Sequence, residues 1–112
     1  MLKLALSSLV LLFSTANALQ LHNLTYRYYQ GETLTENWQS QSGDPASFSL
    51  LLQSTARQAP PETFALVADV STAEGSVSFT VPDVSDGLYV LNAVNVTNDN
   101  DIYSQTASFY VS

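Results

Sequence analysis

The chain has 112 residues, of which ten are acidic and three basic, and its formal net charge is −7. A chain this acidic is repelled by nucleic acid and by anionic membrane surfaces, so we expect neither as a partner. It contains no cysteine, so a folded domain must be stabilised by packing without disulfide bonds.

The first 18 residues have the pattern of a secretory signal peptide. Lys3 gives a positive start, Leu9–Phe13 is the centre of an apolar run, and Ala16–Ala18 is a site that signal peptidase accepts. Serine and threonine interrupt the apolar run, which is shorter than the ~20 residues that a membrane span needs. We predict cleavage after Ala18, a secreted, extracellular protein, and no membrane span in the mature chain. Residues 19–112 are enough for a single domain, with two arginines against ten carboxylates and a net charge of −8.

Residues 19–112 read as short alternating runs separated by turn residues, which is typical of an all-β protein. The alternation of apolar and polar side chains is most regular near the middle of the domain. In chain order the runs are 24–29, 33–38, 47–53, 63–70, 76–81, 88–96 and 103–111. Seven runs predict an immunoglobulin-like or fibronectin-III-like antiparallel β-sandwich of about seven strands.

Glu36 interrupts the second run. It shares the parity of Leu34 and Trp38, so a strictly alternating strand would turn its carboxylate inward. Burying an unpaired carboxylate is costly. We therefore expect either an edge or bulged strand at this point, or a partner such as Arg27 or Arg57.

The segment 81–95 has the order that a tyrosine corner requires. Pro82, an acidic turn and Gly87 lead into an alternating strand whose third residue is Tyr89. We expect the phenol of Tyr89 to bond back to upstream backbone while its ring enters the core.

The segment 97–101 is predicted to be the loop before the last strand. Asn98 to Asp101 offer several oxygen ligands of the kind that calcium prefers. The segment lacks the glycine and the distant glutamate of an EF-hand loop, and hairpin turns favour the same residue types. We favour the turn over a calcium site.

Four segments, in matching order, resemble one fungal domain family: Thr33–Trp38 after Gly31, Phe79–Pro82, Gly87–Tyr89, and Phe109–Val111 after Ser104 and Gln105. They are similar to the N-terminal domain of the yeast cell-wall-synthesis proteins of β-1,6-glucan assembly, a domain also found in Ser/Thr-rich GPI-anchored fungal surface proteins. The resemblance implies an immunoglobulin-like fold, a role at the cell wall, and no catalytic centre to carry over. Glu36 departs from the pattern. The sequence shows neither a Ser/Thr-rich stalk nor a hydrophobic tail, which favours a freely secreted domain over an anchored one.

Catalytic chemistry has few candidate residues. His22 is the sole histidine and there is no cysteine, so a nucleophilic triad and a zinc site both lack their usual side chains. His22 is expected in a mobile, solvated terminus. Glu32 and Glu36 could in principle form a carboxylate pair for glycoside hydrolysis, but acidic residues in an acidic protein are usually solvated. We predict a protein that is not an enzyme and has no cofactor and no metal.

Tyrosines concentrate at both ends of the domain, with Tyr26, Tyr28 and Tyr29 in the first run and Tyr103 and Tyr110 in the last. The first and last strands of such a sandwich commonly lie side by side, so these rings could form one glycan-contacting surface. A simpler interpretation is that alternate tyrosines cover the core.

The partner is predicted to be cell-wall polysaccharide, in particular β-glucan. The alternative is a secreted protein-interaction module that adds a partner's strand to a sheet edge. A structural wall protein without a ligand is a third interpretation.

Two sequons are present, Asn23-Leu24-Thr25 and Asn95-Val96-Thr97. A secreted chain would expose both to the oligosaccharide transferase. We expect N-glycans on Asn23 and Asn95.

Overall fold

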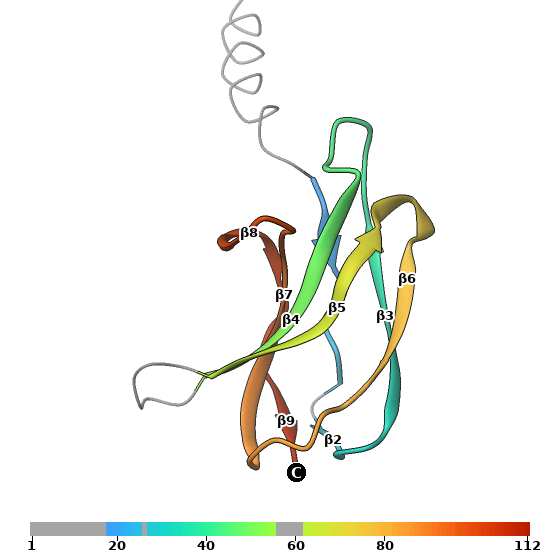
Figure 1. The fold of residues 1–112 in the computed structure, drawn as a ribbon. Helices are drawn as coiled ribbons and strands as arrows, with labels where there is room; N and C mark the ends of the chain where they lie inside the picture. The colour runs from blue at the N-terminus through green and yellow to red at the C-terminus, as the bar shows by residue number, and fades with distance from the viewer. Residues whose placement is uncertain (1–17, 26, 56–61) are drawn as a thin grey trace, which may run out of the picture.

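The chain folds into two facing β-sheets (Figure 1). The computed structural model describes residues 18–25, 27–55 and 62–112. In chain order the elements are β1 (Gln20–Leu21), β2 (Arg27–Tyr28), β3 (Thr33–Gln39), β4 (Ser47–Ser54), β5 (Thr63–Ser71), the short 3-10 helix η1 (Thr72–Glu74), β6 (Ser76–Thr80), β7 (Gly87–Asn95), β8 (Asn98–Gln105) and β9 (Phe109–Val111). One sheet has the order β1-β3-β6, and the other has the order β2-β9-β7-β4-β5, with β8 also paired to β7.

The structure confirms the predicted all-β, immunoglobulin-like sandwich, although its described residues form nine strands where the sequence predicts about seven. The last predicted run is divided because Thr106 interrupts it. Its backbone N–H donates to the carbonyl of Leu91, and its hydroxyl accepts the N–H of Leu91, both at 3.0 Å. The Thr106 hydroxyl thus accepts a hydrogen bond that a backbone carbonyl would accept in a regular strand pair, and β9 begins only at Phe109. Among the described residues, no helix has the length and apolar character that a membrane crossing requires.

The start of the domain is a strand, which corrects the expectation of a mobile terminus around His22. β1 pairs antiparallel with the end of β3, and the His22 N–H donates to the carbonyl of Asn37 at 3.0 Å. Leu19 and Leu21 are buried in the core. These two leucines hold β1 in place, whereas the His22 side chain is exposed.

The predicted loop 97–101 is also corrected. The turn consists of Val96 and Thr97 alone, and β8 begins at Asn98, which pairs with Asn95. The side-chain Oδ1 of Asn95 accepts hydrogen bonds from the backbone N–H and the hydroxyl of Thr97, both at 2.9 Å. This local bond closes the hairpin in two residues, so the acidic residues that follow belong to a strand.

The core lies between the sheets and is filled by aliphatic side chains around two aromatic pairs. Trp38 packs edge-on against Phe48 with 5.1 Å between ring centroids, and its indole N–H donates to the carbonyl of Thr72 at 2.8 Å. Phe109 packs edge-on against Tyr28. Each polar ring atom at these sites has a partner, so the aromatic burial carries little desolvation cost.

The tyrosine corner forms as predicted. Tyr89 is buried, and its hydroxyl donates to the carbonyl of Ser85 at 2.5 Å. Burial raises the pKa of the phenol, with smaller contributions from the charges of Glu62 and Asp86. Tyr89 therefore remains a protonated donor, which fixes the chain where it enters β7.

Glu36 faces inward on β3, and the predicted bulge is wrong. β3 lies between β1 and β6, its burial alternates without interruption, and its register with β6 is regular. Arg27, one of the two proposed partners, lies over Tyr110 instead. Arg57 lies outside the described residues. Within the described part of the chain, neither carboxylate oxygen of Glu36 has a hydrogen-bond partner.

Candidate functional site

The first and last strands of the large sheet lie side by side. β2 pairs in parallel with β9, so that Arg27 is opposite Tyr110 and Tyr28 is opposite Val111. Successive residues of a strand point to opposite faces of the sheet. One pair must therefore face the core and the other must face outward.

Tyr28 belongs to the inward pair. Its ring packs edge-on against Phe109, with 5.9 Å between ring centroids. Its hydroxyl accepts hydrogen bonds from the backbone N–H of Thr25 at 3.0 Å and from the Thr25 hydroxyl at 2.6 Å. Both the ring and the hydroxyl of Tyr28 thus have partners inside the domain.

Tyr110 belongs to the outward pair. The Arg27 guanidinium lies 4.7 Å from its ring centroid, and Arg27 also donates to the hydroxyl of Ser112 at 3.2 Å. Leu88 of β7 is paired with Tyr110 on the other side and is 49 % exposed. We call Arg27, Tyr110 and Leu88 the outer row.

The other predicted tyrosines lie elsewhere. Tyr29 directly follows β2 and is 58 % exposed. Tyr103 lies on β8 and packs against the core cluster. Tyr26 lies outside the described residues. The structure therefore brings Tyr110 and Leu88 together in the outer row, and Tyr29 follows Arg27 of this row by two residues. Tyr28 and Tyr103 are separated from this surface.

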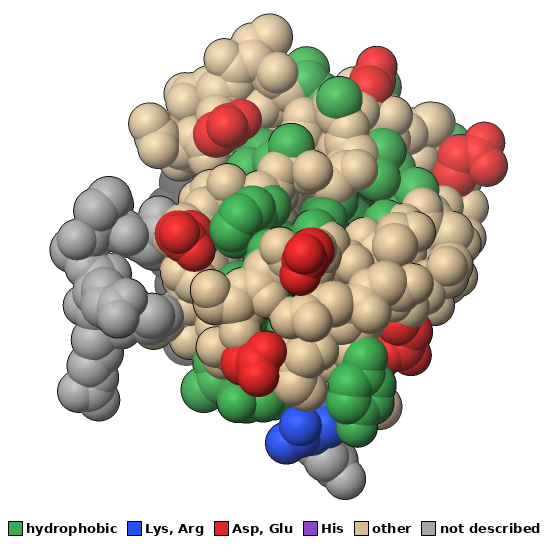
Figure 2. Space-filling model, turned by 60° about the horizontal axis from the view of Figure 1, so that its bottom comes forward, with side chains coloured by type: hydrophobic (Ala, Val, Ile, Leu, Met, Phe, Trp, Pro, Cys, Tyr) green, Lys and Arg blue, Asp and Glu red, His purple; other side chains and the backbone are tan. Residues whose placement is uncertain are grey.

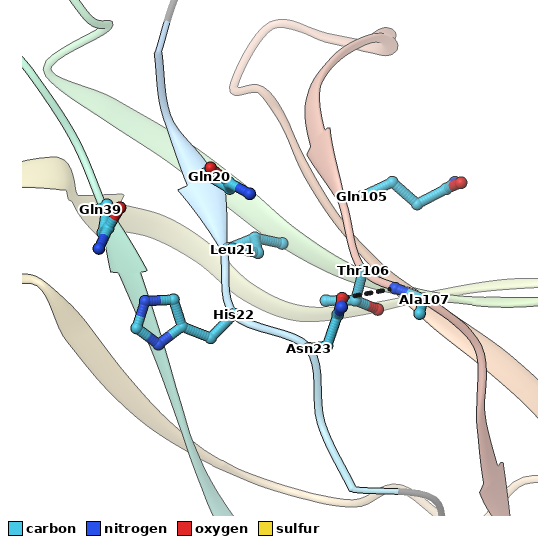
Figure 3. Close-up of a pocket in the computed structure, with 8 residues that line it drawn as sticks. All are labelled: Gln20, Leu21, His22, Asn23, Gln39, Gln105, Thr106 and Ala107. Atoms are coloured by element: carbon cyan, nitrogen blue, oxygen red, sulfur yellow. Dashed lines mark hydrogen bonds between the residues drawn. The ribbon is translucent and has the colours of Figure 1, made fainter.

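A groove of about 680 Å³ lies beside β1, and none of the outer-row residues lines it (Figure 3). It is lined by polar and apolar residues from β1 and the segment after it, from the end of β3, and from the break between β8 and β9: Gln20, Leu21, His22, Asn23, Gln39, Gln105, Thr106 and Ala107. β1 joins the two sheets here, because the Leu21 N–H donates to the Ser104 hydroxyl at 3.0 Å. The Gln105 side chain points away from the groove in Figure 3. It donates instead to Asn92 at 2.8 Å.

This groove could not be predicted from the sequence, because its residues come from three distant segments that have no shared motif. The signal that could have indicated it is the sequon at Asn23. Asn23 lines the groove, and its Oδ1 accepts the backbone N–H of Ala107 at 2.8 Å. Asn95, the other sequon asparagine, lies at the end of β7 and donates from Nδ2 to Asp101 at 3.1 Å.

The acidic residues do not gather into a catalytic arrangement in the described part of the chain. Figure 2 shows acidic side chains spread mostly singly among uncharged ones. Glu32 and Glu36, the carboxylate pair considered for glycoside hydrolysis, lie in different environments. Glu36 is buried, whereas Glu32 is exposed and accepts the backbone N–H of Tyr29 at 2.9 Å. Within the described residues, no three His, Cys, Asp or Glu side chains are grouped so as to hold a metal ion.

Glu36 has the strongest electrostatic perturbation of these acids. Burial raises the pKa of its carboxyl from 4.5 to about 7, and the backbone N–H of His22 opposes this rise only weakly. That N–H already donates to the carbonyl of Asn37, so it offers the carboxylate little. The acid is sealed in the core, where no substrate can reach it, and its role concerns stability.

A family model described as the Kre9/KNH-like N-terminal Ig-like domain matches residues 23–111, which is most of the chain. A search of curated proteins found no match.

Proposed function

Because the chain belongs to the Kre9/KNH-like N-terminal Ig-like domain family, we propose that it is a non-catalytic secreted domain that associates with fungal cell-wall β-glucan. Family membership supports a cell-wall role of the β-1,6-glucan-assembly kind. Glucan binding, secretion and the lack of catalysis are the further steps of the proposal.

Secretion is supported by the signal-peptide pattern and by where the domain begins. Leu19, the first residue after the predicted cleavage site, is 4 % exposed and belongs to the core. Cleavage after Ala18 would thus release the described domain with β1 complete. A cut a few residues later would remove core leucines.

The absence of catalysis is supported by the placement of the acids. Glycoside hydrolysis needs two carboxyl groups that flank the scissile bond within about 5 to 10 Å of each other. Glu36 is enclosed in the core, and Glu32 is held in the turn before β3. This arrangement favours binding over bond cleavage.

The outer row is the surface that best suits a neutral polysaccharide, and its aromatic and apolar exposure is the observation that carries the proposal. Tyr110 and Leu88 lie in one row, and Tyr29, two residues after Arg27 of the same row, exposes more than half of its surface. Aromatic rings bury large apolar areas against the C–H faces of sugars, while the phenol hydroxyl can bond to sugar hydroxyls. The mature protein has a net charge of −8 and would repel an acidic polymer. Its charge therefore favours a neutral polysaccharide as the ligand.

The test is retention of the purified full-length secreted protein on insoluble β-1,6-glucan. We expect the wild type to be retained and the double variant Tyr29→Ser with Tyr110→Ser to be released. Tyr103→Ser is the matched control, because Tyr103 packs against the core on β8 and should leave retention unchanged. Circular dichroism establishes that each variant is folded.

Two results would contradict the proposal. Retention of the double variant at the wild-type level would mean that the outer row is not the contact surface. Failure of the wild type to bind any wall glucan would instead favour a protein partner. The specific surface for that alternative is an edge of the sheets, because within the described residues β5 pairs only with β4 and β6 only with β3.

A further inference from the structure

The groove beside β1 is shaped for a sugar that the protein carries itself. We propose that an N-glycan on Asn23 lies with its first N-acetylglucosamine units in this groove and covers the junction between β1, β3 and the β8–β9 break. This inference is independent of glucan association, since none of the outer-row residues lines the groove.

The side chain of Asn23 is oriented for this role. It is exposed, and its Oδ1 is held by the Ala107 N–H at 2.8 Å. A backbone N–H can only be matched by the amide oxygen, so the hydrogen bond assigns the orientation of the amide. Nδ2 is therefore left for the glycan, at the wall of the groove.

Attachment requires a lipid-linked diphosphate oligosaccharide, the donor of the secretory route. A bond forms between Nδ2 and C1 of the first sugar, and the bond from C1 to the diphosphate oxygen breaks. Nδ2 loses one proton, which leaves with the lipid diphosphate. The carbonyl oxygen of the asparagine takes no part in the new bond, so its hydrogen bond to Ala107 is kept.

The groove walls match the chemistry of N-acetylglucosamine. Gln20 and Gln39 are paired across β1 and β3, and both side chains line the groove (Figure 3). Amide side chains both donate and accept hydrogen bonds, as the hydroxyls and N-acetyl groups of the sugar do. The groove is lined by no Asp, Glu, Lys or Arg side chain, and its volume of about 680 Å³ lies within the range of ligand sites.

Asn95 provides a comparison within the same chain. Its Oδ1 accepts two bonds from Thr97, and its Nδ2 already donates to Asp101 at 3.1 Å. A glycan at Asn95 would leave Nδ2 with one proton for the bond to Asp101 and would project from the end of the β7–β8 hairpin. We expect this glycan to be exposed, in contrast to the one at Asn23.

The test compares the release of each glycan from folded and unfolded protein. The full chain is secreted from a yeast host and treated with an endoglycosidase that cuts between the first two N-acetylglucosamines, and each glycopeptide is followed by mass spectrometry. We expect Asn23 to be occupied and its glycan to be released on the order of tenfold more slowly from the folded protein, the factor that corresponds to docking worth about 1.4 kcal/mol. Unfolding should remove the difference. An unoccupied Asn23, or equal release from folded and unfolded protein, would overturn the proposal.

A groove variant distinguishes docking of the glycan in the groove from simple steric blocking of the endoglycosidase by the folded protein. Gln20→Ala with Gln39→Ala keeps the sequon intact and should raise release at Asn23 toward the unfolded rate, with no change at Asn95. Slow release that persists in this folded variant would also overturn the proposal.

A second measurement covers the case in which the groove variant does not fold. Thr25→Ala abolishes the sequon, and Thr25→Ser keeps both the sequon and the hydroxyl that donates to Tyr28. We expect faster hydrogen exchange of the backbone amides of Gln105 to Ala107 in Thr25→Ala than in Thr25→Ser, because only the latter carries the covering glycan. Equal exchange in the two variants would contradict docking.

Discussion

Glu36 is a carboxylic acid at a buried core position that an apolar side chain would normally occupy. It is 0 % exposed, and both of its oxygens lack partners within the described residues. The charged form is strongly disfavoured in such surroundings, so the group keeps its proton and the pKa rises to about 7. The penalty for this residue therefore depends on pH.

Folding stability should fall as pH rises from about 4.5 to about 7. In this window the folded state holds a proton on Glu36 that the unfolded chain, with its ordinary pKa of 4.5, has released. Each pH unit then costs about 1.4 kcal/mol, so the whole window costs about 3 kcal/mol. Below the window both states are protonated and above it both are ionised, so this contribution is flat on either side. Urea unfolding at a series of pH values measures it.

The matched variant is Glu36→Gln, which has nearly the same shape and no titration. We expect its free energy of unfolding to exceed that of the wild type at pH 7.5 and to lose the Glu36 part of the pH dependence. Identical pH profiles for the two proteins would show that Glu36 gains a partner in solution.

At the scale of elements, the tyrosine corner and the Trp38 site test how the two sheets are held together. Tyr89→Phe removes one hydrogen bond to Ser85 and should cost about 1 kcal/mol. Trp38→Ala opens a cavity against Phe48 and should cost about 3 to 5 kcal/mol. Chemical denaturation gives both values. The reverse ranking would mean that the packing between β3 and β4 contributes little to stability.

The first strand makes a separate prediction. Leu21 is buried on β1, and Leu21→Ala should lower the free energy of unfolding by about 2 to 5 kcal/mol. Gln20→Ala is the control on the same strand, because its side chain is exposed and should change stability by less than about 0.5 kcal/mol. Thermal or urea unfolding of the mature protein measures both. Equal effects would indicate that β1 is detached from the core in solution.

Elements with a strong alternating pattern could be predicted from the sequence, and those fixed by single side chains could not. β3 and β6 follow the period of two that marks half-buried strands, and the tyrosine corner has its own local signature. β1 has only two residues, too few for a periodic pattern, and its pairing depends on burial of Leu19 and Leu21. The position of the β7–β8 turn depends on the Asn95 side chain. Such tertiary and side-chain contacts leave no periodic trace.

At the scale of the whole molecule, the tyrosine prediction shows the same limit. The sequence correctly implies that the first and last strands are neighbours, and β2 does pair with β9. It does not tell which tyrosine faces outward, because that depends on the register of a two-residue strand. Tyr28 is turned to the core by this register and Tyr110 to the surface. The groove, built from three segments, is likewise a property of the assembled fold.

The charge distribution of the molecule predicts how glucan association should respond to salt. Contacts between charges weaken as salt shortens the screening length from about 10 Å at 0.1 M to about 3 Å at 1 M. The proposed contact uses aromatic and apolar groups with neutral hydrogen bonds, which salt does not screen. Retention on insoluble glucan should therefore stay constant, or rise slightly, as sodium chloride is raised from about 0.05 M to about 1 M, a range over which charge screening increases strongly.

Arg27 gives the matched control for this prediction. It is the one cationic side chain in the described residues that lies beside the proposed contact, where it covers one face of the Tyr110 ring. Arg27→Gln removes the charge, and retention should not fall, because a ring face is freed and no ionic contact with a neutral polymer is lost. A loss of retention with salt in the wild type, together with weak binding by Arg27→Gln at low salt, would show that binding is ionic and that the ligand is an acidic polymer.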